Sequence, residues 1–337
     1  MGVFENHFAL VVGVEHYPKW GANKRLTGAS ADAKAVYAWL TDTETGGGVP
    51  SDNAVLIPST EEPPHPLDDH VDDALERILE AAAESEPEGR RLYFYFSGHG
   101  AALEPRGLAL CLTKWSKNRR AALDAKGYLD FAQGSGVFDE VIFFLDCCRN
   151  RVVKPAANPP DLIFYIPGQQ ANRARSLMAY ATEHTDRSFE VEVAEDQRRG
   201  IFTSVLLDVL RAAPDDGGTG ISLGQLRARL EAEVPLRAKA HELAQRPEMQ
   251  HDFPTDREPR FGQMRGAGDL IIDARADRAE VVLYDGENVE LARWSGADGP
   301  RSFQLPSSLL LLEDTASGEQ TFIRYRSTPG EEIRVQF

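Results

Sequence analysis

The fold is decided by the stretch LYFYFSGHG, residues 92–100, and by its counterpart VIFFLDCC, residues 141–148. Each begins with five apolar residues in a row, a pattern that predicts a strand buried on both faces of a sheet. Polar residues follow at once, so reactive groups stand just past the end of each strand. Because the carboxyl ends of parallel strands meet at one edge of a sheet, we expect the two polar clusters to lie together.

Apolar patterns on both sides of this pair extend the sheet. Their alternation between strand and helix predicts an α/β fold, a mostly parallel sheet flanked by helices. The predicted strands are Phe8–Val14, Ala54–Pro58, Leu92–Phe96, Val141–Leu145 and Leu177–Ala181, and the predicted helices are Ala29–Leu40, Val71–Ala83, Ile201–Leu210 and Leu223–Val234.

From Asp269 onward the pattern changes to short alternating runs separated by turns such as Asp285-Gly286. This predicts a small antiparallel β-domain of roughly 70 residues. The segment contains no His, Cys or Lys, so it offers little nucleophilic or metal chemistry. We therefore expect a chemically active domain over residues 1–265 and a regulatory or partner-docking β-domain over residues 266–337.

Composition narrows the class of protein. Charged residues make up 27% and apolar residues 42% of the chain, the balance of a globular protein. The net charge of −16 argues against nucleic acid or an anionic membrane as the main partner. Three cysteines are too few for a disulfide framework, and neither a secretion signal nor a membrane-spanning run is visible. We expect a cytoplasmic protein.

Cys148 and His99 are the candidate catalytic pair, 49 residues apart in the sequence (99 to 148). A thiol is a weak nucleophile and needs an imidazole to share its proton. The backbone amides of Gly100 and Cys148 could hold the oxyanion of an acyl-transfer intermediate. Taken singly, Cys148 could be a buried apolar cysteine and His99 a turn residue, but their joint placement favours catalysis.

These residues resemble the caspase-fold cysteine peptidases of clan CD, family C14, in their bacterial, metacaspase-like branch. The resemblance covers about Val3–Arg265 and rests mainly on Ser-Gly-His-Gly and Asp-x-Cys, with shorter matches at Ala9–Val14 with Tyr17, Leu26–Ala33, Tyr180–Thr182, Gly200–Thr203 and Gln245–Pro247. It implies that Cys148 is the nucleophile and that His99 transfers the proton, with or without a third triad member. Cys147 as the nucleophile is the alternative.

The residue after the nucleophile is His in many metacaspases and Arg149 here. This departure from the family pattern leaves the nucleophile intact but predicts more cationic surroundings, which would favour the thiolate of Cys148.

The resemblance also implies a primary specificity pocket formed by Asp32, Ser97 and Asp146. Two carboxylates that converge on one pocket favour a cation, so we expect Arg or Lys before the cut, and Arg can be held bidentately. Caspases that select Asp use arginines in this pocket, and none stands at the matching positions. The alternatives are that Asp32 is an ordinary charge at a helix start and that Asp146 is an ordinary strand-end carboxylate.

No metal or other cofactor is expected. Many metacaspases need calcium on acidic loops, but the loop after His99 is basic, with Lys114, Lys117, Arg119 and Arg120. We therefore predict activity without calcium. Zinc is not expected because no CxxC or HxxxH spacing occurs.

Activation is left open between two readings. The residues of Asn150–Ser176 include Arg151, Lys154, Arg173 and Arg175, and Arg198-Arg199 follows later, so self-cleavage or cleavage by another protease is one reading. The other is that these residues only keep exposed loops solvated. The polar segment Glu183–Asp196 is expected to form a mobile loop at the rim of the substrate cleft.

The sequence thus predicts a cysteine endopeptidase that cuts protein substrates after Arg or Lys. The resemblance places it in a bacterial defence or cell-death pathway, with an activating protease or regulatory protein as a possible partner. Two alternatives stay open: an inactive caspase-like adaptor that acts through its β-domain, and a zymogen that is silent until another protein acts on it.

Overall fold

The computed structural model of the chain describes residues 4–116, 118–119, 121–151, 156–164, 174–194, 197–212, 214, 219–265, 269–286, 289–304, 308–325 and 332–337. Its contacts divide the chain into two compact units. The first comprises Met1–Leu210 with Leu226–Pro259, and the second comprises Arg211–Gln225 with Arg260–Phe337. The domain boundary predicted at residue 265 stays a prediction.

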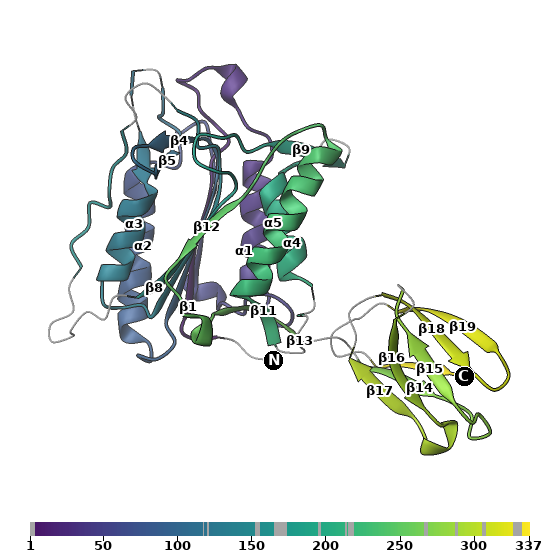
Figure 1. Ribbon diagram of the computed structural model, residues 1–337. Coiled ribbons are helices and arrows are strands. Elements are labelled where there is room, and N and C mark those ends of the chain that lie inside the picture. The colour runs from purple at the N-terminus through teal and green to yellow at the C-terminus, as the bar shows by residue number, and fades with distance from the viewer. Residues whose placement is uncertain are drawn as a thin grey trace. The chain divides into compact units, whose positions relative to one another are not determined.

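The first unit is built on a six-stranded sheet with the order β12-β8-β7-β3-β1-β2 (Figure 1). All neighbouring strands are parallel except β12, which runs antiparallel to β8 at one edge. The predicted mostly parallel α/β sheet is therefore confirmed. Its strands are β1 (His7–Gly13), β2 (Ala54–Ile57), β3 (Arg91–Ser97), β7 (Glu140–Asp146), β8 (Arg175–Tyr180) and β12 (Glu248–His251).

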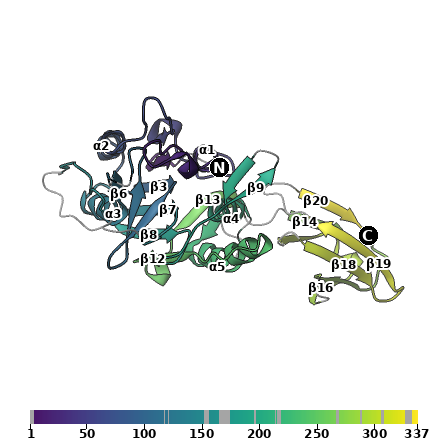
Figure 2. The same ribbon diagram turned by 90° about the horizontal axis from the view of Figure 1, so that it is seen from above.

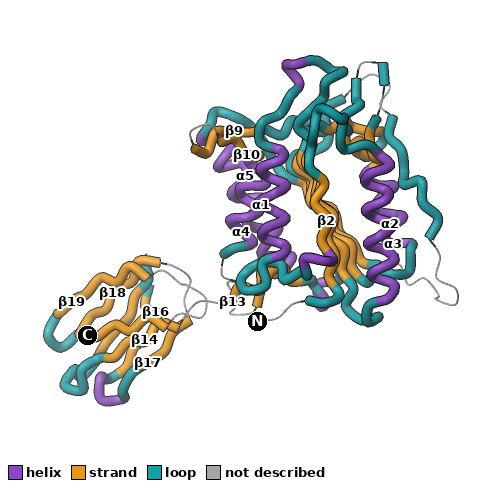
Figure 3. Tube along the Cα trace, turned by 180° about the vertical axis from the view of Figure 1, so that it is seen from behind, coloured by secondary structure: helices purple, strands orange, loops and turns teal. Residues whose placement is uncertain are grey.

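Helices cover both faces of this sheet. On one face lie α2 (Asp68–Glu84) and α3 (Ala125–Gly134), and on the other lie α1 (Ala29–Thr41), α4 (Ile201–Leu210) and α5 (Leu223–Ala240), as Figures 1 and 3 show. The view from above in Figure 2 places the strands between the two helical layers. Two smaller sheets lie beside them: β4 (Gly100–Leu103), β5 (Gly107–Cys111) and β6 (Ala122–Asp124), and the hairpin β9 (Glu190–Ala194) with β10 (Gln197–Gly200).

Helix α5 is longer than predicted. The sequence predicts an end at Val234, yet the helix continues past Pro235 to Ala240. Leu226, Leu230, Val234 and Ala238 recur every four residues and are all buried, so one apolar stripe continues across the proline. Burial of this stripe outweighs the cost of the missing amide donor at Pro235.

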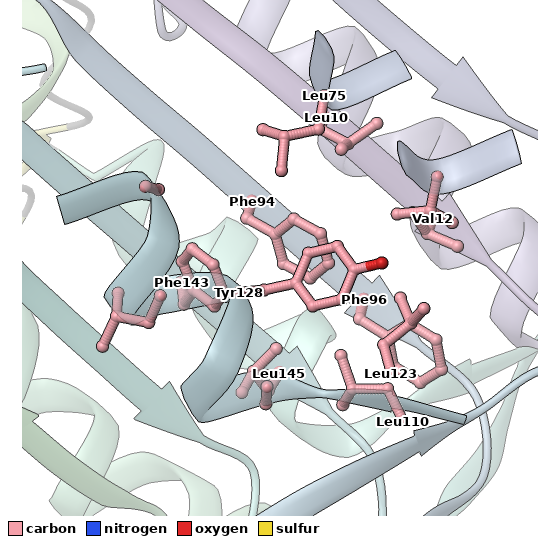
Figure 4. Packing of buried hydrophobic residues seen from close by; sticks show 14 of the residues in the cluster. Leu10, Val12, Leu75, Phe94, Phe96, Leu110, Leu123, Tyr128, Phe143 and Leu145 are labelled. Carbon is pink, nitrogen blue, oxygen red and sulfur yellow. The ribbon is translucent and has the colours of Figure 1, made fainter. Parts of the chain in front are cut away.

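Aromatic side chains fill the space between the sheet and the layer of α2 and α3. The rings of Phe94 and Phe143 stack with centroids 4.5 Å apart, and Tyr128 of α3 lies against Phe94 at 6.3 Å (Figure 4). The buried hydroxyl of Tyr128 donates to the carboxylate of Asp72 in α2, so its polar atom is satisfied. This packing fixes β3 and β7, the two strands that carry the polar clusters.

The second unit is made of β-strands around its own core, which includes Trp294, Leu312 and Tyr325. The predicted antiparallel pairing is confirmed in its four-stranded sheet, whereas β14 and β20 pair in parallel. Its strands are β11 (Thr219–Ser222), β13 (Arg260–Arg265), β14 (Asp269–Asp273), β15 (Val281–Tyr284), β16 (Glu290–Trp294), β17 (Arg301–Gln304), β18 (Ser308–Asp314), β19 (Glu319–Tyr325) and β20 (Glu332–Gln336). Across the described ranges of both units, no helix has the length and apolar character needed to cross a membrane.

Candidate active site

Neighbouring strands bring the predicted residues to one edge of the sheet. Ser97, the last residue of β3, is directly opposite Asp146, the last residue of β7, in the parallel register. Two residues later in each segment come His99 and Cys148. On the other side of β3, Ser97 is opposite Gly13 of β1, so the edge of three strands forms the floor of the site.

A cavity of about 530 Å³ opens above this edge. Four of the predicted residues line it: Ser97, His99, Asp146 and Cys148. The other lining residues are Arg25, Leu26, Thr27, Gly98, Cys147, Ser188, Phe189, Glu190, Arg198 and Gly200. The two remaining predicted residues, Asp32 and Gly100, are bonded to or packed against this lining, as described below.

The thiol of Cys148 is held by Ser188, a residue of the loop predicted at the cleft rim to which the sequence gave no individual role. Its Sγ lies 3.3 Å from both the amide nitrogen and the carbonyl oxygen of Ser188. Burial raises the pKa of Cys148, while the Ser188 amide works in the opposite direction. Within the described residues no hydrogen bond joins Cys148 to His99, and the thiol donates to the Ser188 carbonyl instead.

The imidazole of His99 is held in one tautomer. Its Nε2 lies 2.8 Å from the carbonyl oxygen of Lys24. A carbonyl can only accept, so Nε2 carries the proton and Nδ1 is left with the lone pair that a base needs. Burial lowers the pKa of His99, which keeps the ring neutral. The hydrogen-bond partner of the His99 ring is thus a backbone carbonyl, which has no side-chain signature in the sequence.

Two aromatic side chains fix the position of His99. The ring centroids of Tyr17 and Trp20 lie 4.8 and 5.0 Å from that of the imidazole. The Tyr17 hydroxyl also accepts a hydrogen bond of 2.8 Å from the backbone amide of His99. The sequence named Tyr17 as part of a matching segment but gave it no role.

Gly100 is placed where a side chain does not fit. A Cβ on Gly100 would lie 2.2 Å from the carbonyl oxygen of Cys148 and 2.7 Å from Cys147 Sγ. Two residues along β4, the amide of Ala102 donates to the carbonyl of Asn150. Since alternate amides of a strand point the same way, the amide of Gly100 also points toward the segment after β7. This is the orientation that a shared oxyanion site with Cys148 requires.

Arg149 does not act on the thiol as predicted. Its side chain has no exposed surface, its guanidinium pairs with Glu248 of β12, and it lies over the Tyr180 ring, 4.0 Å from the centroid. The Arg149 charge is therefore compensated within the core. Because burial raises the pKa of Cys148 instead, the prediction that Arg149 favours the thiolate is wrong.

Asp146 and Asp32 are buried carboxylates, with 4% and 0% of their surface exposed. Asp146 Oδ1 accepts from Ser188 Oγ at 2.8 Å, and its Oδ2 accepts from the amide and the hydroxyl of Thr203 at 3.1 and 2.6 Å. Asp32 Oδ2 accepts from the amide of Gly200 at 2.8 Å, whereas Asp32 Oδ1 is buried with no partner. The acceptor capacity of Asp32 is thus partly unused.

Burial dominates the electrostatics of this pair, and the charge of Arg199 acts in the opposite direction at Asp32. Desolvation raises the pKa of both carboxyls, and the neighbouring Asp146 raises that of Asp32 further. Within the part of the chain that is described, no Lys or Arg forms an ion pair or hydrogen bond with either carboxylate. A cation brought by another molecule would meet both needs, because it compensates the charge and donates to Asp32 Oδ1.

The sequence missed the contribution of Ser188, Phe189 and Glu190. The loop predicted at the cleft rim supplies these residues to the cavity wall, and from Glu190 onward it forms β9 rather than loop. The amide of Phe189 is fixed by Gln245 Oε1 at 3.1 Å. Residues 195–196 of the predicted loop lie outside the described residues, as do Lys117 and Arg120 of the basic loop after His99.

Comparisons with known proteins show similarity to a family of peptidases. A family model of the caspase domain, peptidase family C14, matches residues 6–257. A protein named as a probable protease from a Desulfuromonadales bacterium is 30% identical over an alignment of 227 residues, and the match covers 61% of this chain and 26% of that protein. The match therefore spans about a quarter of that relative's length.

Two solved structures are also similar to this chain. The crystal structure of caspase-1 from Spodoptera frugiperda has a TM-score of 0.46 and 14% identity, and covers 74% of this chain and 89% of that one. A crystal structure of a protein from Geobacter sulfurreducens has a TM-score of 0.45 and 18% identity, and covers 76% and 97% of the two chains.

Proposed function

The chain belongs to the caspase-domain family of peptidases, family C14, and from this membership we propose that it is a cysteine endopeptidase that cuts proteins after Arg or Lys. Cys148 is the proposed nucleophile, His99 the proton carrier, and Asp32, Ser97 and Asp146 the pocket for the substrate cation. No metal or other cofactor takes part in the proposed reaction.

The proposed acylation starts when the substrate carbonyl enters the cavity beside Cys148. His99 Nδ1 takes the thiol proton as Sγ bonds to the carbonyl carbon, and the amides of Gly100 and Cys148 hold the oxyanion. His99 then gives its proton to the leaving amine as the peptide bond breaks. In the second half, His99 takes a proton from water, the oxygen of that water attacks the thioester, and the proton returns to the departing Cys148 sulfur.

One observation carries the proposed specificity: Asp32 Oδ1 has no hydrogen-bond partner although it is fully buried, behind Gly200 of the cavity lining, whose amide donates to Asp32 Oδ2. An unsatisfied buried acceptor costs about 1–3 kcal/mol, and more when it is charged. Donation by a substrate guanidinium or ammonium would remove this cost only while the substrate is bound. A second carboxylate, Asp146, adds charge from the neighbouring strand end.

The resting contact between Cys148 and Ser188 supports a role for activation, because the thiol must leave the Ser188 carbonyl to reach His99. Among the proposed self-cleavage positions, Arg151 is exposed, whereas Arg175, Arg198 and Arg199 belong to paired strands. Lys154 and Arg173 lie outside the described residues. A bacterial defence or cell-death role in the cytoplasm, with a protein activator, belongs to the same proposal.

The test is hydrolysis of fluorogenic peptides that carry Arg, Lys, Asp or Leu before the cut, with EDTA or with calcium. The wild type is compared with Cys148→Ala and with Cys147→Ala, a matched change at the adjacent residue. Cleavage after Arg or Lys that is lost only in Cys148→Ala and indifferent to EDTA supports the proposal. Cleavage after Asp, or a requirement for calcium, contradicts it.

A further inference from the structure

Glu190 is a carboxylate of the cavity wall that the proposed chemistry leaves without a role. It begins β9 and lines the cavity together with Cys148 and Asp146. Its Oε1 accepts from the amide of Gly28 at 3.1 Å and its Oε2 from the amide of Thr27 at 3.3 Å. Each oxygen thus has one backbone donor and keeps acceptor capacity for a second one.

Three acids therefore share one small volume. The pKa of Glu190 is raised by burial and then by Asp146, and Glu190 in turn raises that of Asp32. The nearest wall cation, Arg198, donates from its Nη2 to the Glu190 carbonyl at 2.7 Å. Its guanidinium is thus hydrogen-bonded to the backbone of Glu190, and the carboxylate receives only backbone amides among the described residues.

The acceptors still free to meet a ligand differ between the three acids. Asp146 already accepts three hydrogen bonds from Ser188 and Thr203. Asp32 has an unpartnered Oδ1 that is buried behind the cavity lining, and Glu190, in the lining itself, has the second lone pairs of its two oxygens. Asp32 belongs to the first turn of α1 and Glu190 to β9, so the free acceptors come from separate elements.

We propose that Glu190 is a specificity-determining residue of this pocket and that, with Asp32, it selects the guanidinium of Arg over the ammonium of Lys. The inference rests on the proposed function and deepens it. A guanidinium presents five N–H donors in a plane and can donate along two edges to carboxylates from different elements. An ammonium is a point charge whose three donors radiate from one atom, so it gains less from a second, separate acid.

A purely structural role for Glu190 makes a different prediction. Its carboxylate also accepts from the amides of Thr27 and Gly28, just before α1 begins at Ala29, where a negative charge favours the helix N-terminus. If this were its whole role, loss of the charge would disturb the pocket for every substrate by the same factor. The two roles are therefore separated by substrates that differ only in the cation.

The test compares Glu190→Gln with Glu192→Gln, which removes the same charge from an exposed side chain on the same strand. Peptides identical except for Arg, Lys or the neutral isostere citrulline before the cut are used in two assays. One is kcat/KM for hydrolysis, and the other is equilibrium binding to the Cys148→Ala protein, with and without Glu190→Gln. Thermal melting of each variant reports on folding.

We expect Glu190→Gln to weaken Arg binding and hydrolysis about tenfold, Lys by about threefold, and citrulline by less than twofold, with Glu192→Gln unchanged. Equal losses for all three peptides would overturn the proposal and leave Glu190 a structural residue. Failure of the parent protein to prefer Arg or Lys over citrulline would overturn the proposed function first and this inference with it. The binding assay separates these outcomes even where hydrolysis is silent.

Discussion

The two sides of the cavity differ in how well their polar atoms are satisfied. On the catalytic side, His99 and Cys148 each have a backbone partner, Lys24 and Ser188, and burial favours the neutral form of both. On the acidic side, Asp32, Asp146 and Glu190 are crowded together without a paired cation, and one oxygen of Asp32 has no partner. The catalytic side is thus satisfied within the protein, and the acidic side keeps one buried acceptor without a partner in the described part of the chain.

This difference indicates a division of labour. On the catalytic side, the hydrogen bonds of the resting state are complete. In the proposed reaction, the Cys148 thiol exchanges its hydrogen bond with Ser188 for one with His99. On the acidic side, one buried acceptor has no partner. A ligand that brings positive charge and hydrogen-bond donors is therefore the kind that this side should bind most favourably. Substitutions on the first side should change the rate for all substrates, and those on the second should change which substrate is used.

The largest effect is expected for Cys148→Ala, which removes the nucleophile from the catalytic side. Hydrolysis should fall on the order of 10³-fold or more for every peptide. The control Cys147→Ala changes a fully buried neighbour and should reduce stability rather than the rate. If Cys147→Ala were inactive and Cys148→Ala active, the catalytic side would be misassigned.

The next largest effect is expected for Asp32→Asn, which should lower kcat/KM for Arg peptides by removing a charge from the acidic side. Replacement removes a charge from a buried site that receives a cation, which costs about 3 kcal/mol of Arg recognition, or roughly 10²-fold in kcat/KM. Peptides with citrulline before the cut should change little, because they bring no charge. Parallel losses for Arg and citrulline peptides would show that Asp32 supports the fold of the pocket and not the recognition of charge.

Tyr17→Phe should weaken the catalytic side without touching the acidic side. Loss of the hydroxyl leaves the buried amide of His99 without its acceptor, a change of about 1–2 kcal/mol or roughly tenfold in rate if the imidazole shifts. We expect kcat to fall for Arg and citrulline peptides alike, with KM almost constant. A selective loss for Arg would contradict this assignment.

The pH dependence should separate the two sides within one protein. The pKa of His99 is lowered and those of Asp32 and Asp146 are raised, so burial moves the titration of the imidazole to lower pH and that of the two acids to higher pH. The acid limb of kcat/KM should therefore lie at higher pH for Arg peptides than for citrulline peptides. Coincident limbs, measured on the same preparation, would contradict the comparison.

The smallest effect is expected for the stability of Asp32→Asn. The same substitution that lowers hydrolysis of Arg peptides should raise the melting temperature at neutral pH. A carboxyl whose pKa is raised on folding is stabilising while protonated, and this contribution is lost as pH rises through its folded pKa. Asp32→Asn should therefore melt a few degrees higher than wild type at neutral pH, and the difference should vanish in acid. A lower Tm for Asp32→Asn at neutral pH would mean that the acid is compensated within the protein.

The central sheet and much of the site could be predicted because both follow from side-chain patterns. Continuous apolar runs define β3 and β7, and the polar residues that end them are opposite one another in the register. The backbone groups that form hydrogen bonds with His99 and Cys148 are not marked by any pattern of side chains in the sequence. The carbonyl of Lys24 and the peptide of Ser188 are ordinary main-chain groups, and only the fold brings them to His99 and Cys148.

Glu190 and Arg149 show two ways in which distance along the sequence fails to predict a role in the site. A residue far from the site in the sequence can line the cavity, and a residue next to the nucleophile can be buried elsewhere. Glu190 is 162 residues from Gly28, its hydrogen-bond partner, and nothing in a polar, acidic loop distinguishes it from its neighbours. Arg149 adjoins the nucleophile in sequence, yet its charge is compensated by Glu248 of an edge strand. That strand, β12, has no continuous apolar run and was not predicted, so the partner of Arg149 could not be foreseen.

The most direct test of the two-sided cavity is covalent labelling with a peptidyl chloromethyl ketone that carries Arg at its end, read by intact mass and peptide mapping. The account predicts one adduct, on Cys148, formed much faster than with the matched citrulline or Asp reagent and slowed in Asp32→Asn. An adduct on Cys147, or equal rates for the Arg and Asp reagents, would contradict it.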